Sequence, residues 1–349
     1  MRPRIPVRHG EVSWGWEGGL LEAARKTGAS FPEGLSELRE EARRGLSLPQ
    51  GEPVVASGHQ PLPVHPGILL RQLFLAALPQ DVARVWISVD SDAPGAISFP
   101  VPLRRRGYTH HELVLLRNPN RLVLAARPAP GQKALARAWE LMEARLSTLK
   151  NQGILRRAEE AWKRLPPPEG PWPGWWEEAK GRLAGLAGVR VIQVSELAAS
   201  QAFKDFVSLL LCKKEGFLSA YGKAVRLCGL PSLSPGELPF WRLEGGKRGP
   251  ARAPGEAQLP RALTLTFFLR AVVCDFFLHG AGGAGYEPGV DLLFREVFGM
   301  EPPPWGWLSG TFLLPEPSGE RRLPGRAYPF FLHDLLEVRE ALSGPLSAL

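Results

Sequence analysis

The sequence predicts an α/β protein with a mostly parallel sheet, helices on both faces and further helical additions. Short apolar runs alternate with segments of helical spacing along the chain, which is the pattern of strand–helix–strand units. The run at 85–90 is apolar on both faces, as strands buried inside a parallel sheet are. Hydrophobic residues make up 44% of the 349 residues, enough to fill a large core.

Residues 1–50 are expected to form an N-terminal helical cap. Apolar side chains at helical spacing, with charged residues between them, occur at 20–26 and 35–46. Such spacing is typical of surface helices with one buried face. The chain then divides into this cap, a first part of the core with a helical insertion over 51–165, and a second part of the core over 166–349.

The core begins with one strand–helix–strand unit. Residues 54–57 form a short, mostly β-branched run followed by a polar loop, and Pro66 stands where a helix would start. Proline suits the first turn of a helix. The strand at 85–90 completes the unit, whose crossover is expected to be right-handed. The apolar face of the intervening helix would consist of Leu69, Leu70, Leu73, Phe74 and Ala77.

A helical insertion and a linker are expected after this unit. Further strands are predicted at 97–103, 112–116 and 122–126, followed by a helical hairpin over 132–164. The proline-rich stretch 166–174 is the clearest linker in the chain. We expect the tryptophans around it, Trp172, Trp175 and Trp176, to be able to dock it on the core.

The second part of the core repeats the alternation of helices and strands. Residues 262–278 form the longest apolar run, which charged residues interrupt, and predict a buried helix rather than a membrane span. The remaining elements are predicted as a helix at 175–186, a strand at 189–194, helices over 202–227, a strand at 240–243 with a basic hairpin tip at 245–249, a helix at 288–298 and a strand at 307–314.

The basic charge favours an anionic ligand. The net charge is +8 and the pI is about 9.7, which fits either a plain solvated surface or an anionic metabolite or nucleic acid. The densest basic clusters, at 104–106 and 247–248, are too short for a nucleic-acid tail. The arginine-rich composition fits a GC-rich genome or a thermophile.

The cysteines and the first residues favour a cytoplasmic protein. Cys212, Cys228 and Cys274 are few, widely spaced and odd in number, which argues against a disulfide scaffold and for a reducing compartment. The first residues lack the apolar core of a signal peptide. No membrane association is expected.

Two histidines mark the loop that follows the first strand. Gly58, His59 and Gln60 precede His65 and Gly67, which stand at the expected helix start. In open α/β sheets, ligands bind beyond the carboxyl ends of the strands. His59 and His65 are therefore candidate catalytic residues that stabilise an anion or move a proton. The alternative is that they cap the helix and pair with backbone groups.

Two aspartates follow the next strand and should face the same crevice. Asp90 and Asp92 are candidate catalytic residues that would orient a histidine or an amine. The alternative is a simple turn, since Asp-Ser-Asp precedes Pro94 and Gly95. A metal site of these aspartates and the two histidines lacks zinc-type spacing, and none is predicted.

A glycine-rich loop downstream is the second candidate for ligand binding. Glycines allow backbone amides to approach an anion. We predict that this loop and the histidine loop meet at one site, although a plain turn is the alternative. Arg261 and Arg270 either reach this site or satisfy helix ends. The candidate ligand-binding residues of the loop are His279, Gly280, Gly282, Gly283 and Tyr286.

Both loops resemble the cysteine-adding enzyme of bacillithiol biosynthesis, which has a Rossmann-like core. In that family a strand runs into Gly-Gln-Gln, then a Gly-Pro turn and a helix that carries a lysine. Residues 58–60 and 65–67 are similar to these two segments, and Arg71 stands for the lysine. The acidic end of the family's next strand resembles 90–92, and its late arginine-bearing helix and glycine loop resemble 261–286.

The chain is most similar to bacterial relatives of that enzyme, over residues 53–315. Those relatives carry Gly-His-Gln-Pro, His-Pro-Gly, Pro-Phe-Trp, Arg-Ala-Leu-Thr and His-Gly-x-Gly-Gly-x-x-Tyr, all present here. Gly285 and Glu287 replace the lysine and aspartate that flank the last tyrosine in the relatives.

The resemblance implies a Rossmann-like, ligase- or transferase-like enzyme that binds a small anionic metabolite, with a nucleotide such as ATP or ADP as the candidate cofactor. The alternative is a non-catalytic nucleotide- or nucleic-acid-binding protein. The sequence predicts no oligomeric state.

Overall fold

A six-stranded sheet forms the centre of the computed structural model, which describes residues 3–16, 19–27, 31–317, 321–323 and 327–349. The strand order is β1-β11-β10-β2-β3-β6. All neighbouring strands run parallel except β1, which pairs antiparallel with β11. The predicted α/β class with a mostly parallel sheet is therefore confirmed, and the sheet is mixed. The strands are β1 (Glu11–Trp16), β2 (Val54–His59), β3 (Ala83–Ser88), β6 (Arg190–Gln193), β10 (Phe276–His279) and β11 (Trp305–Thr311).

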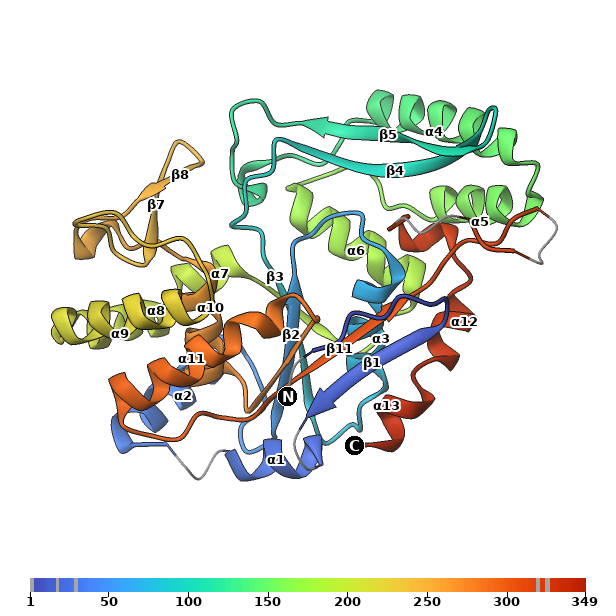
Figure 1. The fold of residues 1–349 in the computed structure, drawn as a ribbon. Helices are drawn as coiled ribbons and strands as arrows, with labels where there is room; N and C mark the ends of the chain where they lie inside the picture. The colour runs from blue at the N-terminus through green and yellow to red at the C-terminus, as the bar shows by residue number, and fades with distance from the viewer. Residues whose placement is uncertain (1–2, 17–18, 28–30, 318–320, 324–326) are drawn as a thin grey trace.

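Helices cover both faces of the sheet (Figure 1). Val55 and Trp86 belong to one apolar core, whereas Val54, Ala56 and Val85 belong to the other, because successive side chains of a strand point to opposite faces. The first core packs against α1 (Leu20–Thr27), α3 (Pro66–Ala77), α6 (Trp172–Ala184), α12 (Leu335–Glu340) and α13 (Ser343–Ser347). The second packs against α2 (Glu33–Gly45), α7 (Val194–Ala199), α8 (Gln201–Cys212), α9 (Lys214–Leu227), α10 (Ala262–Phe268) and α11 (Glu287–Leu293).

The two expected helices of the first fifty residues are present as α1 and α2. The sequence did not predict β1, an edge strand that precedes them and pairs with β11 in register from Glu11–Thr311 to Trp16–Gly306. Its side chains are mostly half-buried, so its sequence lacks the continuous apolar run of the central strands. The N-terminal segment is thus helical only in part.

The first strand–helix–strand unit is confirmed as β2, α3 and β3. His65 is the N-cap of α3 and Pro66 occupies its first turn. The start of α3 packs closely on β11, since a Cβ atom placed on Gly67 would lie 1.8 Å from the carbonyl oxygen of Gly310. Only glycine fits this contact.

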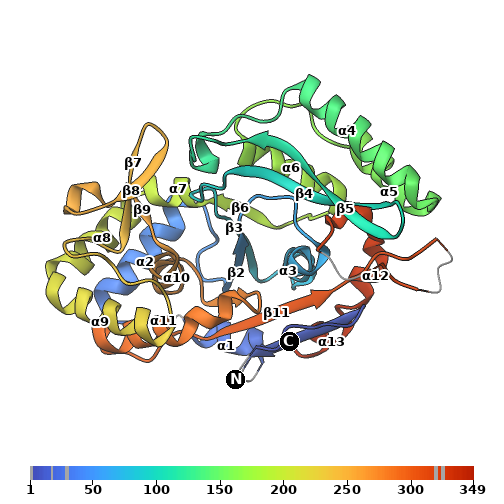
Figure 2. The same cartoon turned by 45° about the horizontal axis from the view of Figure 1, so that its top comes forward.

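The insertion is a separate hairpin of β4 (Ala96–Arg104) and β5 (Tyr108–Arg117) beside α4 (Gln132–Leu146) and α5 (Gln152–Lys163). Figures 1 and 2 both show these elements stacked on one side of the molecule, away from α1. The strand predicted at 122–126 is wrong, because 124–126 form a 3₁₀ turn. Its backbone N–H groups donate to the carbonyl oxygens of Asp92 and Asp90 instead of to a strand.

The predicted linker is docked on the core. Trp172, Trp175 and Trp176 are buried, and their indole N–H groups donate to backbone carbonyls of Pro61, Pro166 and Leu62. Helix α6 begins at Trp172, so the last residues of the predicted linker are helical.

The buried helix predicted over 262–278 is too long. Helix α10 continues as a π-helical turn over Leu269–Val273, and the chain then enters β10 in the middle of the sheet. A buried helix and a buried parallel strand are both apolar on all sides, so the apolar pattern alone does not separate them.

A small three-stranded sheet flanks the core. It consists of β7 (Phe240–Glu244), β8 (Lys247–Pro250) and β9 (Leu259–Pro260), and its β7–β8 turn is the predicted basic hairpin tip. None of the helices in the described ranges has the length and apolar character that a membrane crossing requires.

We expect Gly67→Ala to lower the free energy of unfolding by about 3 kcal/mol or more, because the added methyl overlaps the backbone of Gly310. Denaturant titration measures the change. Gly216→Ala in α9 is the control, since a Cβ at Gly216 meets no atom within 4 Å and alanine favours a helix by about 0.5–1 kcal/mol. Equal stability of the two variants would contradict the close contact between α3 and β11.

Candidate functional site

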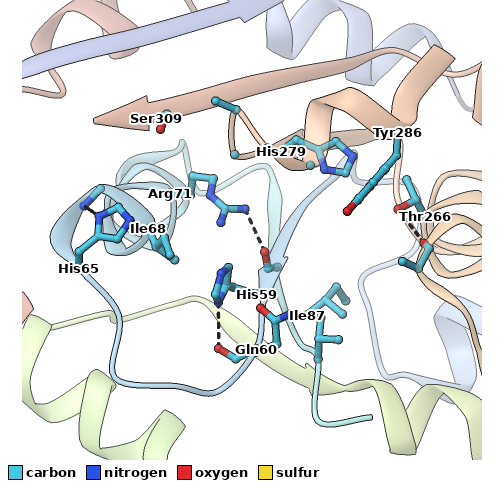
Figure 3. A pocket seen from close by; sticks show the side chains of 18 of the residues that line it. His59, Gln60, His65, Ile68, Arg71, Ile87, Thr266, His279, Tyr286 and Ser309 are labelled. Atoms are coloured by element: carbon cyan, nitrogen blue, oxygen red, sulfur yellow. Dashed lines mark hydrogen bonds between the residues drawn. The ribbon is translucent and has the colours of Figure 1, made fainter. Parts of the chain in front are cut away.

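One cavity of about 890 Å³ lies at the carboxyl ends of the parallel strands, and both predicted loops line it (Figure 3). This is the position where open α/β sheets bind ligands, and the volume is in the range of small-molecule sites. Asp90 and Arg261 are the candidate residues that do not line it. Those that do are Gly58, His59, Gln60, His65, Gly67, Arg71, Asp92, His279, Gly280, Gly282, Gly283 and Tyr286.

Arg71 of α3 carries a buried charge into this cavity (Figure 3). Its guanidinium donates to the Ser57 hydroxyl at 3.0 Å and to the Gly58 carbonyl at 2.9 Å, but its Nε has no hydrogen-bond partner. Among the described residues, no carboxylate pairs with it. Burial lowers its pKa to about 10, so the guanidinium stays charged at neutral pH.

The glycine loop lies directly over this charge. A Cβ atom on Gly280 would stand 3.5 Å from the Cζ atom of Arg71. The first loop approaches from β2, where a Cβ atom on Gly58 would lie 2.6 Å from the Ile87 carbonyl oxygen. Because Arg71 also donates to the Gly58 carbonyl, the two loops meet at Arg71, although more than two hundred residues separate them in the chain.

His59 and His65 line the cavity as neutral imidazoles. Burial and the nearby Arg71 lower the pKa of His59 to about 3 and that of His65 to about 4. The Nδ1 atom of His65 accepts a hydrogen bond from the backbone N–H of Gly67 at 3.1 Å. This histidine therefore caps α3, which was the alternative to a catalytic role in the sequence analysis. Its proton is then on Nε2.

The two aspartates occupy different environments. Asp90 is buried and accepts hydrogen bonds from the backbone N–H and the hydroxyl of Ser195 at the start of α7. Burial raises its pKa, although these hydrogen bonds oppose the shift. Its expected place in the crevice is therefore wrong, because Asp90 fastens the end of β3 to α7.

Asp92 does line the cavity, and its partner is a cation that the sequence did not single out for the site. Arg248 of β8 donates to its carboxylate at 3.0 Å and lies over the Trp241 ring, 5.2 Å from the centroid. The weak contact of Gln60 with the same carboxylate is 3.5 Å long. The only signal in the sequence was the short basic hairpin tip.

Arg261 is placed outside the cavity lining, contrary to its predicted role in ligand binding. It pairs with Glu237 at 2.9 Å and also lies over the Trp241 ring, 4.0 Å from the centroid. It therefore fastens the small sheet to the start of α10. Arg270 is fully buried and satisfies Glu287 and the Pro303 carbonyl.

The His279 imidazole is held by a carboxylate. Its Nε2 bonds to Glu287 in the first turn of α11, and the other carboxylate oxygen of Glu287 bonds to Arg270. Burial would raise the pKa of Glu287, but Arg270 and His279 outweigh it and lower the pKa. In the sequence, Glu287 stood out only where the glycine motif differs from the family that it resembles, so no pattern pointed to this network.

The rest of the cavity wall separates into apolar and polar parts. Ser309 and Thr311 at the end of β11 add hydroxyl groups. The apolar part includes Ile5, Val7, Ile68, Ile87, Val89, Trp241, Leu265, Leu269, Phe277, Phe312 and Leu313.

A second buried cation lies behind Arg71. Lys180 of α6 pairs with Glu177 at 2.7 Å. Both cations contact the Trp86 ring, whose centroid is 5.1 Å from the Lys180 Nζ and 5.5 Å from the Arg71 Cζ. Ser88 also donates to Glu177. Glu177 thus binds Lys180 and Ser88 and does not form an ion pair with Arg71.

Within the described ranges, no three His, Cys, Asp or Glu side chains are grouped closely enough to hold a metal ion. The comparisons with known proteins match no family model and no curated protein to this chain. The geometry of the cavity is therefore the main evidence on function.

We expect the free energy of unfolding to fall as the pH drops from about 6.5 to 5. The pKa values of His59 and His333 are lowered to about 3 and that of His65 to about 4. Below pH 6.5 the unfolded chain therefore binds protons that these histidines do not bind in the folded chain. The stabilising effect of each such group is complete above pH 6.5. Below pH 6.5 it decreases by up to about 1.4 kcal/mol per pH unit.

Denaturant unfolding at several pH values measures this slope. His333→Gln removes one of the three groups and should make the slope shallower. Constant stability between pH 7 and 5 would show that these imidazoles are not buried as described.

Proposed function

We propose that this chain is a ligase- or transferase-like enzyme that binds a small anionic metabolite or nucleotide in the cavity, with Arg71 as its anchor. The observation that carries the proposal is the buried guanidinium without a carboxylate. A buried charge that lacks a partner is costly, and a phosphate or carboxylate group of a ligand supplies the partner. An arginine can bind such a group through two parallel hydrogen bonds.

The surroundings of Arg71 suit an anion of limited size. Because residue 280 is a glycine, it places no side chain over the guanidinium. The Ser309 hydroxyl offers a further donor, whereas the Thr311 hydroxyl donates to the Pro6 carbonyl. His59 and His65 are neutral, so they would contribute single hydrogen bonds rather than charge. The apolar wall would receive the uncharged part of the ligand, such as a nucleobase.

The reaction class is drawn from the resemblance to the cysteine-adding enzyme of bacillithiol biosynthesis. That resemblance involves the same loops, 58–67 and 279–286, that line the cavity. It also supports a Rossmann-like relationship of the parallel core. The few, widely spaced cysteines support a cytoplasmic setting. A nucleotide such as ATP or ADP is the candidate cofactor, and its phosphates would be the group on Arg71.

We expect Arg71→Met to reduce the affinity for ADP or pyrophosphate at least 100-fold, measured by isothermal titration calorimetry. The melting temperature should change by only a few degrees, because the cation that is removed has no ion-pair partner in the described structure. Arg71→Lys keeps the charge without the planar fork and should bind with intermediate affinity.

Arg261→Gln is the matched control, since this arginine lies outside the cavity lining and its loss should leave the affinity unchanged. Equal affinity of the wild type and Arg71→Met would contradict the proposal. Salt-dependent DNA binding that survives in Arg71→Met would favour a nucleic-acid-binding protein instead.

A further inference from the structure

The second loop carries a histidine whose orientation is fixed from three directions. His279 ends β10 and lines the cavity while only 6% exposed. Its Nε2 bonds to Glu287, and Phe277 packs edge-on against its ring at a centroid distance of 4.6 Å. Trp305 approaches it edge-on at 6.4 Å. The imidazole therefore has one position relative to the cavity, and Figure 3 shows it facing the same hollow as Arg71.

The partners of Glu287 determine which nitrogen of His279 carries the proton. Arg270 holds one oxygen of the buried carboxylate, and together with His279 it lowers the pKa of Glu287 in spite of burial. An ionised carboxylate only accepts hydrogen bonds, so the Nε2 of His279 must donate. In the neutral imidazole the lone pair is then on Nδ1.

The Nδ1 atom lies next to Gly283. A Cβ atom on Gly283 would stand 2.7 Å from Nδ1, inside normal contact distance. Any other residue at 283 would place a side chain against this nitrogen, whereas glycine leaves Nδ1 uncovered by a side chain from this position. Gly282 differs, since a Cβ there meets no atom within 4 Å.

We propose that His279 is a general base of this site, with Glu287 and Arg270 as positioning residues. Its substrate is a protic acceptor X–H, which is a hydroxyl, amine or thiol compound. The proposal rests on the proposed function for the second substrate, an anionic donor R–Y held by Arg71.

The step is a group transfer that balances within the two substrates. The Nδ1 of His279 takes the proton of X–H, and the freed electron pair of X bonds to the electrophilic carbon or phosphorus of R–Y. The bond to Y breaks with its electron pair, and Y takes the proton back from Nδ1. Glu287 stays ionised and stabilises the transient imidazolium, as carboxylates do in histidine-dependent enzymes.

The tautomer of His279 tests whether the Nδ1 atom carries the lone pair that the general base needs. Two-bond ¹H–¹⁵N correlation spectra of protein labelled with [¹⁵N]histidine distinguish the two neutral forms, and His279→Gln identifies the signals. We expect the proton on Nε2. In Glu287→Gln, Arg270 should retain the amide oxygen, so the amide NH₂ faces Nε2 and forces the proton onto Nδ1.

Carbethoxylation by diethyl pyrocarbonate tests whether Nδ1 is open to a ligand. Mass spectrometry of peptic peptides measures the rate of His279 modification at pH 7. We expect Gly283→Ala to slow it at least tenfold, and Glu287→Gln to do the same through the tautomer. Gly282→Ala is the matched control and should react as the wild type does.

Either of two results would contradict the assignment of His279 as a general base. One is a proton on Nδ1 of His279 in the wild-type protein, and the other is equal modification rates in the wild type and Gly283→Ala. Neither measurement requires anion binding. If calorimetry detects no binding of ADP or pyrophosphate, Arg71 is rejected as the anion anchor, but the His279 measurements can still be interpreted. Likewise, if the His279 measurements fail, the test of Arg71 is unaffected.

Discussion

The charge of Arg71 is the constraint on which the organisation of the site depends. Its guanidinium is buried where β2, α3 and the loop after β10 converge, and its only described partners are uncharged oxygens of Ser57 and Gly58. The close contact of α3 with β11 at Gly67 and of β2 with β3 at Gly58 keeps this region dense. A buried charge interacts more strongly than an exposed one with an opposite charge that reaches it.

The cavity distributes its chemistry over separate walls. The anion anchor is on α3, the apolar wall comes mainly from β3 and α10, and the carboxylate-held imidazole comes from β10 and α11. His59 and His65 are close to the anchor, but their low pKa values make them hydrogen-bonding groups rather than proton acceptors at neutral pH. The His279 imidazole instead bonds to the Glu287 carboxylate, which would stabilise an imidazolium formed by proton transfer.

The two loops meet as predicted, although the strand that places the second loop, β10, was predicted as the end of a helix. Parallel strands present their carboxyl ends at one edge of the sheet, so loops after β2 and β10 must be neighbours if both strands are central. What the sequence could not predict were the partners. Ser195 binds Asp90 and Glu237 binds Arg261, and each of these pairings joins segments that are distant in the chain. The capping of α3 by His65 is a local contact, and the sequence offered it as the alternative role of this histidine.

The same distinction applies to the fold. The β2–α3–β3 unit has strong local signals and was predicted closely. By contrast, β10 was predicted as the end of a helix, because full burial gives strand and helix the same apolar pattern. The edge strand β1 was missed because it is only half-buried and owes its place to pairing with β11, nearly three hundred residues away.

The most direct test of the central claim is a crystal structure of the protein with ADP bound. We expect phosphate oxygens within about 3 Å of the Arg71 guanidinium, between the Gly280 backbone and the end of β2. Well-ordered ADP that leaves the Arg71 guanidinium without an anion would contradict it.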